Sequence, residues 1–165
     1  MSDSPRVSLL ALFGLLLAVL VSPRFAGAEP INGESIFAVM DVISAVNHAI
    51  AESKSGVDLR EKAVRRFAEC SLMYGGVSRK ASTEDAKKNY VQAQLATMEI
   101  ETAIAQPLEV KRKLEIETAA QRSVILTLDL ARTQGDKELV PFLKGCKSLN
   151  DVKEITNVLR EPARE

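Results

Sequence analysis

The sequence predicts an all-α protein, a small helical bundle of four main helices plus a short C-terminal element, placed after an N-terminal signal peptide. Two observations indicate the helices. Apolar residues recur at three- and four-residue intervals through most of the chain after residue 34, as on one face of an α-helix. No stretch shows the alternation of apolar and polar residues that marks a half-buried strand.

The N-terminus indicates the signal peptide. The apolar run of residues 7–21 precedes Ala26-Gly-Ala28, the small-residue pattern that signal peptidase reads. We expect cleavage after Ala28, which divides the chain into a signal peptide of residues 1–28, a helical domain of residues 29–160 and a polar tail of residues 161–165. An uncleaved anchor is the alternative, but the run is shorter than the roughly 20 residues that a membrane-spanning helix needs.

Export fixes the expected compartment and contacts. The bacterial periplasm is the leading prediction, with eukaryotic secretion or anchoring by an uncleaved N-terminal helix as alternatives. Lys and Arg number 22, and Asp and Glu also number 22, so bulk charge does not attract nucleic acid. The expected partner is a protein of the cell envelope. Contact with the membrane is expected only transiently, through the signal peptide, and the oligomeric state stays open.

The first two helices follow from spacing and from turn residues. Residues 34–53 form the first helix, with one apolar face made by Ile36, Val39, Met40, Ile43, Val46 and Ile50. Gly56 is expected to stop it, and Asp58 to open a second helix. Leu59, Ala63, Phe67, Cys70 and Tyr74 share a stripe of that helix, and Gly75 and Gly76 are expected to end it in a left-handed turn.

The third helix opens at Ser82, which with Asp85 resembles a capping box. Its expected core face carries Ala86, Tyr90, Ala93, Thr97, Ile100 and Ile104. Pro107 cannot continue a regular helix, and we favour a tight break there over a kink.

The rest of the chain carries one long helix and two shorter elements. Residues 108–133 are expected to form the most buried helix, because the second half is apolar over most of its circumference. A one- or two-turn or kinked helix containing Pro141 is expected to end at Gly145. A last helix should span residues 150–160.

Cys70 and Cys146 are the only cysteines, and an exported compartment preserves disulfides. We therefore predict a Cys70–Cys146 disulfide that ties the C-terminal part to the early helices. A redox site would need a Cys-x-x-Cys pair after a strand, and a cysteine nucleophile would have to use His48, the only histidine. Intermolecular disulfides are the other alternative.

Other residues that could support catalysis or cofactor binding form no complete set. Asp41, Ser44 and His48 share one helical stripe, but a hydrolase needs the histidine between acid and nucleophile. One histidine cannot supply the two Glu-x-x-His motifs of a di-iron bundle, and no Cys-x-x-Cys-His binds haem. The sequence therefore predicts no catalytic, metal or cofactor-binding residues and no cofactor.

We expect the charged clusters to lie mainly on the solvent-exposed surface. The basic pairs Arg65/Arg66, Arg79/Lys80 and Lys87/Lys88 are expected to converge on one end, where they could meet an anionic partner. The run of residues 109–117 is expected to stabilise its own helix through Glu109–Lys113 and Lys111–Glu115 pairs. The acidic pairs Glu99/Glu101 and Glu115/Glu117 are expected to be surface charge.

Three functional hypotheses follow. The first is a non-enzymatic binding module of the cell envelope that interacts with another protein. The second is a carrier of a small apolar or amphipathic ligand in a bundle cavity, lined by the third helix, Ile125 and Leu128. The third is an enzyme that depends on Cys70 or His48.

Overall fold

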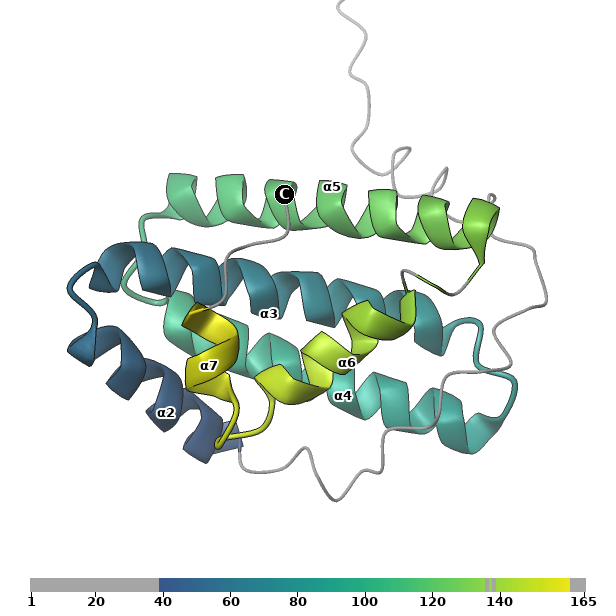
Figure 1. Cartoon of the computed structure of the whole chain (residues 1–165), viewed down its shortest axis with the longest axis horizontal. Helices are drawn as coiled ribbons and strands as arrows, with labels where there is room; N and C mark the ends of the chain where they lie inside the picture. Colours follow the sequence, from purple (N-terminus) through teal and green to yellow (C-terminus); the bar gives the residue numbers. More distant parts are fainter. Residues whose placement is uncertain (1–38, 136, 138, 161–165) are drawn as a thin grey trace, which may run out of the picture.

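The structure is a computed structural model that describes residues 39–135, 137 and 139–160. The predicted signal peptide, its cleavage site and the polar tail lie outside these residues, as does Ile36. The described part of the chain is an all-α bundle without strands, as the sequence predicts. Its helices, shown in Figure 1, are α2 (Val39–Glu52), α3 (Gly56–Ser78), α4 (Glu84–Ala105), α5 (Val110–Gln134), α6 (Leu139–Leu149) and α7 (Ile155–Arg160).

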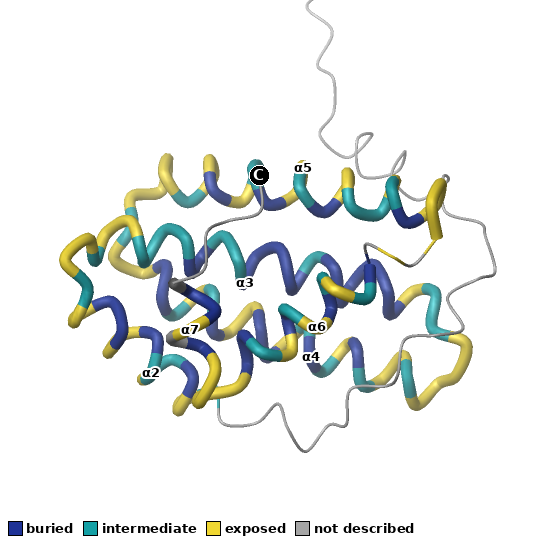
Figure 2. The backbone as a smooth tube through the Cα atoms, viewed as in Figure 1, coloured by how far each residue is buried: buried dark blue, intermediate teal, exposed yellow. Residues whose placement is uncertain are grey.

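Helix α3 is the centre of the bundle. It packs against each of the other five helices, with α5 above it, α2 and α4 below it, and α6 and α7 across the front in the view of Figure 1. Its buried residues extend around the helix and include Phe67, Met73 and Tyr74, each at most 1% exposed. Figure 2 shows the same contrast, since α3 is largely buried while α5 is exposed along most of its length.

Two sequence predictions about burial are therefore wrong. Helix α5 is not the most buried helix, because only Ile116, Ala120, Val124 and Ala131 are buried on it. Gly75 and Gly76 do not end α3, which continues to Ser78, and Gly135 is the only described residue with a positive φ. Both glycines are buried inside the helix, where a Cβ at Gly75 would lie 2.7 Å from Gln94 Nε2, whereas a Cβ at Gly76 would make only an ordinary contact with Leu128.

The helix ends show which local signals were sufficient. Pro107 separates α4 from α5, which confirms the predicted tight break. The cap of α4 is Thr83, whose Oγ1 accepts the Ala86 N–H at 3.2 Å, one residue later than predicted. Gly56 begins α3, where a Cβ would lie 2.8 Å from the carbonyl oxygen of Ile50. Helix α6 continues past Gly145 to Leu149, and α7 begins only at Ile155.

Candidate functional site

Helix α4 has two different apolar faces. The predicted core face is confirmed, since Tyr90, Ala93, Thr97, Ile100 and Ile104 are all buried. The opposite face carries Val91, Leu95 and Met98, which are 38%, 60% and 45% exposed. We call these three residues the outer stripe. Their spacing of four and three residues aligns them along one side of the helix over roughly 10 Å.

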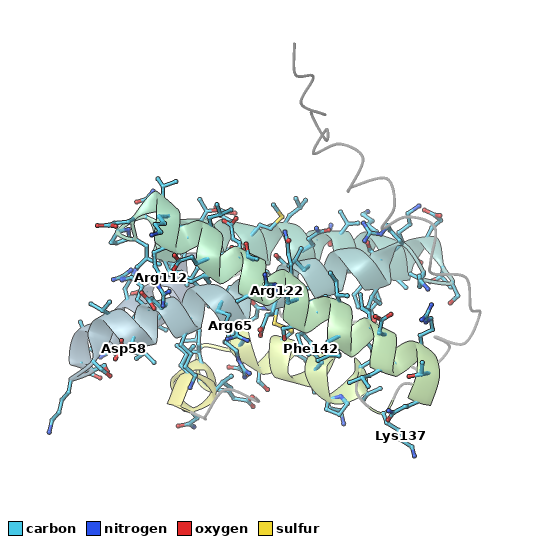
Figure 3. The ribbon with its side chains drawn as sticks, turned by 90° about the horizontal axis from the view of Figure 1, so that it is seen from above. Asp58, Arg65, Arg112, Arg122, Lys137 and Phe142 are labelled. Carbon is cyan, nitrogen blue, oxygen red and sulfur yellow. A yellow bond between two sulfur atoms is a disulfide. The ribbon has the colours of Figure 1, made fainter. Side chains whose placement is uncertain are left out.

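The sequence contained a signal for the outer stripe. Val91, Leu95 and Met98 have the same four- and three-residue spacing as the core residues, so α4 is apolar on two opposite sides. The sequence analysis assigned one of these sides to the core and gave no role to the other side. In the view from above, α4 forms one long edge of the molecule, whereas α6 and α7 form the opposite edge (Figure 3).

Charged side chains lie at both ends of the outer stripe. Lys87 and Lys88 precede Val91, and both are exposed; Glu99 and Glu101 follow Leu95 and Met98. The Nζ atom of Lys87 lies 3.7 Å from Glu84 Oε1, an exposed pair of little energetic weight. Exposed Glu84 and Asp85 lie beside these lysines, so only the C-terminal end of the stripe carries an excess of one sign, which is negative.

Glu101 lies at the edge of this face, partly buried. Burial, with added repulsion from the Glu117 carboxylate of α5, raises the pKa of Glu101 to about 7. The reading of Glu101 as ordinary surface charge is therefore incomplete. Two carboxylates from different helices approach each other at the acidic end of the outer stripe.

Packing against α3 supports α4 from behind. The side chain of Gln94 covers Gly75, so closely that a Cβ at Gly75 would lie 2.7 Å from Gln94 Nε2. The hydroxyl of buried Thr97 donates to the carbonyl oxygen of Ala93 at 2.6 Å. A face carried by such a packed helix keeps its residues in fixed positions.

A guanidinium bridge attaches α5 to α3. Arg112 lies near the start of α5 (Figure 3), where its Nε donates to Glu61 Oε1 at 2.8 Å and its Nη2 donates to Glu61 Oε2. Its Nη1 donates to Glu115 Oε2 at 2.8 Å. The hydrogen bonds from Arg112 lower the pKa of Glu61. In the charged run of residues 109–117, Arg112 thus joins α5 to α3 and also bonds Glu115. This bridge takes the place of the Glu109–Lys113 and Lys111–Glu115 pairs that the sequence predicts.

The two cysteines form the predicted disulfide. Cys70 of α3 and Cys146 of α6 are bonded at 2.04 Å, and both are buried. Asn150 Nδ2 donates to the Cys146 carbonyl oxygen at 3.1 Å. The bond holds α6 on α3, and neither sulfur is available as a nucleophile while it persists.

Two tyrosines pack near this end of α3. The rings of Tyr74 and Tyr90 have centroids 6.3 Å apart, and burial raises the pKa of both hydroxyls. Tyr90 Oη and Asn150 Oδ1 are buried and lack a hydrogen-bond partner. These groups lie within the packed core, and we assign them an architectural role.

The candidate triad of α2 does not assemble. His48, Asp41 and Ser44 are exposed on α2, and His48 Nε2 lies 3.2 Å from Glu52 Oε1. The histidine therefore pairs with an acid one turn later on α2. This arrangement lacks the acid, base and nucleophile order that acyl transfer requires.

The basic pairs do not converge as predicted. Arg65 Nε lies 3.1 Å from Glu69 Oε1 within α3. Arg79 follows Arg65 by fourteen positions along the same helical direction, so their backbones are roughly 20 Å apart. Arg65 and Arg66 are consequently remote from the α3–α4 connection, where Arg79 and Lys80 lie.

A shallow surface pocket of about 330 Å³ lies where the α2–α3 connection meets α7. Glu52, Asp58 and Lys62 give it both signs of charge. Its remaining lining is Ala49, Ser53, Ser55, Leu59 and Leu159. Its polar, open shape differs from the enclosed apolar cavity that a carrier needs.

The described residues contain neither a clustered set of metal ligands nor a membrane-spanning helix. No group of three or more His, Cys, Asp or Glu side chains there is placed to hold a metal ion. None of the described helices combines the length and apolar character of a membrane span.

The fold and these features define the protein as a disulfide-tethered, all-α bundle with an apolar stripe on an outer helix. Comparison with protein-family models, with curated proteins and with solved structures finds no match.

Proposed function

We propose that this protein is an exported, non-enzymatic interaction module of the cell envelope, most simply of the bacterial periplasm, that binds a partner protein through the outer face of α4. The observation that carries the proposal is the outer stripe, in which three large apolar side chains align on the solvent side of a packed helix. Helix faces with such spacing are recognised by grooves or by other helices.

The chemistry of this face favours a protein partner. Lys87 and Lys88 lie beside Glu84 and Asp85 at one end, and Glu99 and Glu101 lie at the other, so the face has no excess of positive charge. Nucleic acid or an anionic membrane surface would favour a uniformly basic rim. The buried disulfide is compatible with export to an oxidising compartment.

The proposal is tested by site-specific photocrosslinking in cells that export the protein. A photoreactive residue at position 95 should give a discrete protein adduct. The matched control is position 126, because Leu126 of α5 is 61% exposed and Leu95 is 60% exposed. Equal crosslinking at both positions, or no adduct at position 95, would contradict the proposal.

The carrier hypothesis receives less support. Ile125, one of its two expected wall residues on α5, is 43% exposed. Leu128 instead packs near Gly76, where its Cδ1 would lie 3.6 Å from an added Cβ. Ligand carriage stays a prediction, but Ile125 and Leu128 do not form the apolar cavity lining on which it was based.

A further inference from the structure

We propose that the Cys70–Cys146 disulfide is a redox-sensitive latch, and that its reduction by a dithiol releases the C-terminal segment of residues 139–160 while α2 to α5 stay folded. This segment carries α6 and α7. The inference does not depend on the outer stripe, and it gives the disulfide a regulatory role in addition to its contribution to stability.

Helices α6 and α7 form the last layer of the bundle. They lie across the front of α3 in Figure 1, and they follow the other described helices in the chain. Helices α2, α4 and α5 each pack directly on α3, and α2 also packs on α4. Release of the last segment therefore interrupts none of the contacts that join α2 to α5.

The segment has little helical stability of its own. Helix α6 has 11 residues and α7 has six, and isolated helices shorter than about 12–15 residues are marginal in water. Gly145 lies inside α6, where glycine is less favourable than alanine. Both helices therefore depend on their packing against the rest of the bundle. The apolar side chains that the segment buries are Leu139, Leu143, Cys146, Leu149, Ile155, Val158 and Leu159.

The disulfide lies within this packed contact. While it is intact, Cys146 cannot leave Cys70, so α6 stays beside α3 and any brief opening closes again. After reduction, the segment is joined to the bundle only through the chain that follows Gly135. The same packing must then hold two short helices without the covalent link.

A buried polar group opposes the closed position. Asn150 directly follows α6 and is 7% exposed. Its Nδ2 donates to the Cys146 carbonyl oxygen at 3.1 Å, but its Oδ1 accepts no hydrogen bond from the described residues. A buried acceptor without a donor disfavours the closed state, and release of the segment hydrates it. Opening therefore removes a cost that the disulfide holds in place.

The releasing step is thiol–disulfide exchange. A thiolate of the dithiol attacks one sulfur and forms a mixed disulfide, and the second thiol then closes the dithiol to its own disulfide. The dithiol thus supplies two electrons and two protons, the S–S bond of the protein breaks, and Cys70 and Cys146 become thiols. Both cysteines are at most 5% exposed, so the attack on the folded protein follows local opening around α6.

Hydrogen–deuterium exchange of the purified full chain measures the release. After treatment with dithiothreitol, the amides of residues 139–160 should lose protection at least about tenfold, whereas those of α3 and α4 should keep theirs. Cys70→Ala/Cys146→Ala should show this pattern without reductant, and dithiothreitol should not change it. Unchanged protection of residues 139–160 in the reduced protein overturns the proposal. An equal loss in all helices also overturns it, because the disulfide then stabilises only the fold as a whole.

Alkylation of the two thiols gives an independent measurement. If the segment is released, both thiols of the reduced, folded protein should react with iodoacetamide nearly as fast as in urea, because their burial is lost. If the segment stays closed, the thiols remain buried and react far more slowly than in urea, and this result overturns the proposal.

Discussion

Helices α3 and α5 are both long, yet they have opposite environments. Helix α3 includes Arg60, Arg65 and Arg66, but thirteen of its residues are buried. Helix α5 includes the apolar run of residues 124–131, but only four of its residues are buried. The apolar run of α5 thus lies mostly outside the core, while α3, despite its arginines, forms the centre of the bundle (Figure 2).

The difference shows that burial depends on how many neighbours a helix can accept. Helix α3 carries small buried residues on several sides, and all five other helices pack against it. These small residues are Ala63, Ala68, Ser71, Gly75 and Gly76. The hydroxyls of Ser71 and Ser78 donate to carbonyl oxygens three residues earlier, at 3.0 Å, so they can be buried without cost from unpaired groups. Helix α5 packs mainly on α3 and leaves Ile125 and Leu126 exposed.

Removing a large side chain should have the greatest effect in α3. Phe67 is fully buried, so Phe67→Ala should lower the free energy of unfolding by about 4 kcal/mol, through lost burial and the cavity that remains. Leu126→Ala on α5 should change it by less than about 0.5 kcal/mol. Urea unfolding measures both variants, and equal losses would refute the contrast between the helices.

The disulfide adds a second link to α3. Cys70 and Cys146 are separated by 76 positions, for which loop closure gives an upper stabilisation of roughly 4–5 kcal/mol. We expect Cys70→Ala/Cys146→Ala to lose about 3 kcal/mol, since strain and residual denatured structure reduce the effect. Reductant should destabilise the wild type by a similar amount and leave this double variant unchanged. Two free thiols in exported, denatured protein would disprove the link.

Glu101 should make stability depend on pH at the α4–α5 side. Its pKa rises from 4.5 unfolded to about 7 folded, so the folded state binds the proton more tightly. This stabilisation is complete below pH 4.5 and is lost as pH rises through 7. Glu101→Gln should therefore stabilise the protein at pH 8 by roughly 1–2 kcal/mol, a figure reduced for partial exposure, with little gain near pH 4.

Urea unfolding at pH 4 and pH 8 gives this comparison. Glu99→Gln is the matched control, because Glu99 is exposed on the same helix. If Glu101→Gln stabilised the protein equally at both pH values, ionisation of the Glu101 carboxyl group would not be the cause of the gain.

Much of the fold follows from local sequence signals. Periodicity predicts the helices, Pro107 predicts the break between α4 and α5, and two cysteines allow one internal pair. These features depend on residues close in sequence or on simple pairing. They need no knowledge of how the helices are arranged.

Burial and the candidate site could not be predicted in the same way. A Gly-Gly pair after an apolar run fits a helix end as well as a close helix contact, and only the position of Gln94 and Leu128 distinguishes the two. Likewise, Val91, Leu95 and Met98 become an exposed stripe only because α2 and α3 cover the other side of α4. Both properties arise from tertiary packing.

The smallest predicted effect is on stability, and it distinguishes Gly75, where close packing requires glycine, from Gly145, where it does not. Both Gly75 and Gly145 lie inside helices, where alanine is favoured by roughly 0.5–1 kcal/mol. An added Cβ at Gly145 meets no atom within 4 Å, so Gly145→Ala should gain that full amount. At Gly75 the Cβ would force the end of Gln94 to move, and the gain should be cancelled. Thermal unfolding should therefore shift upward for Gly145→Ala alone, and a matching rise for Gly75→Ala would show that α3 does not depend on close packing at this position.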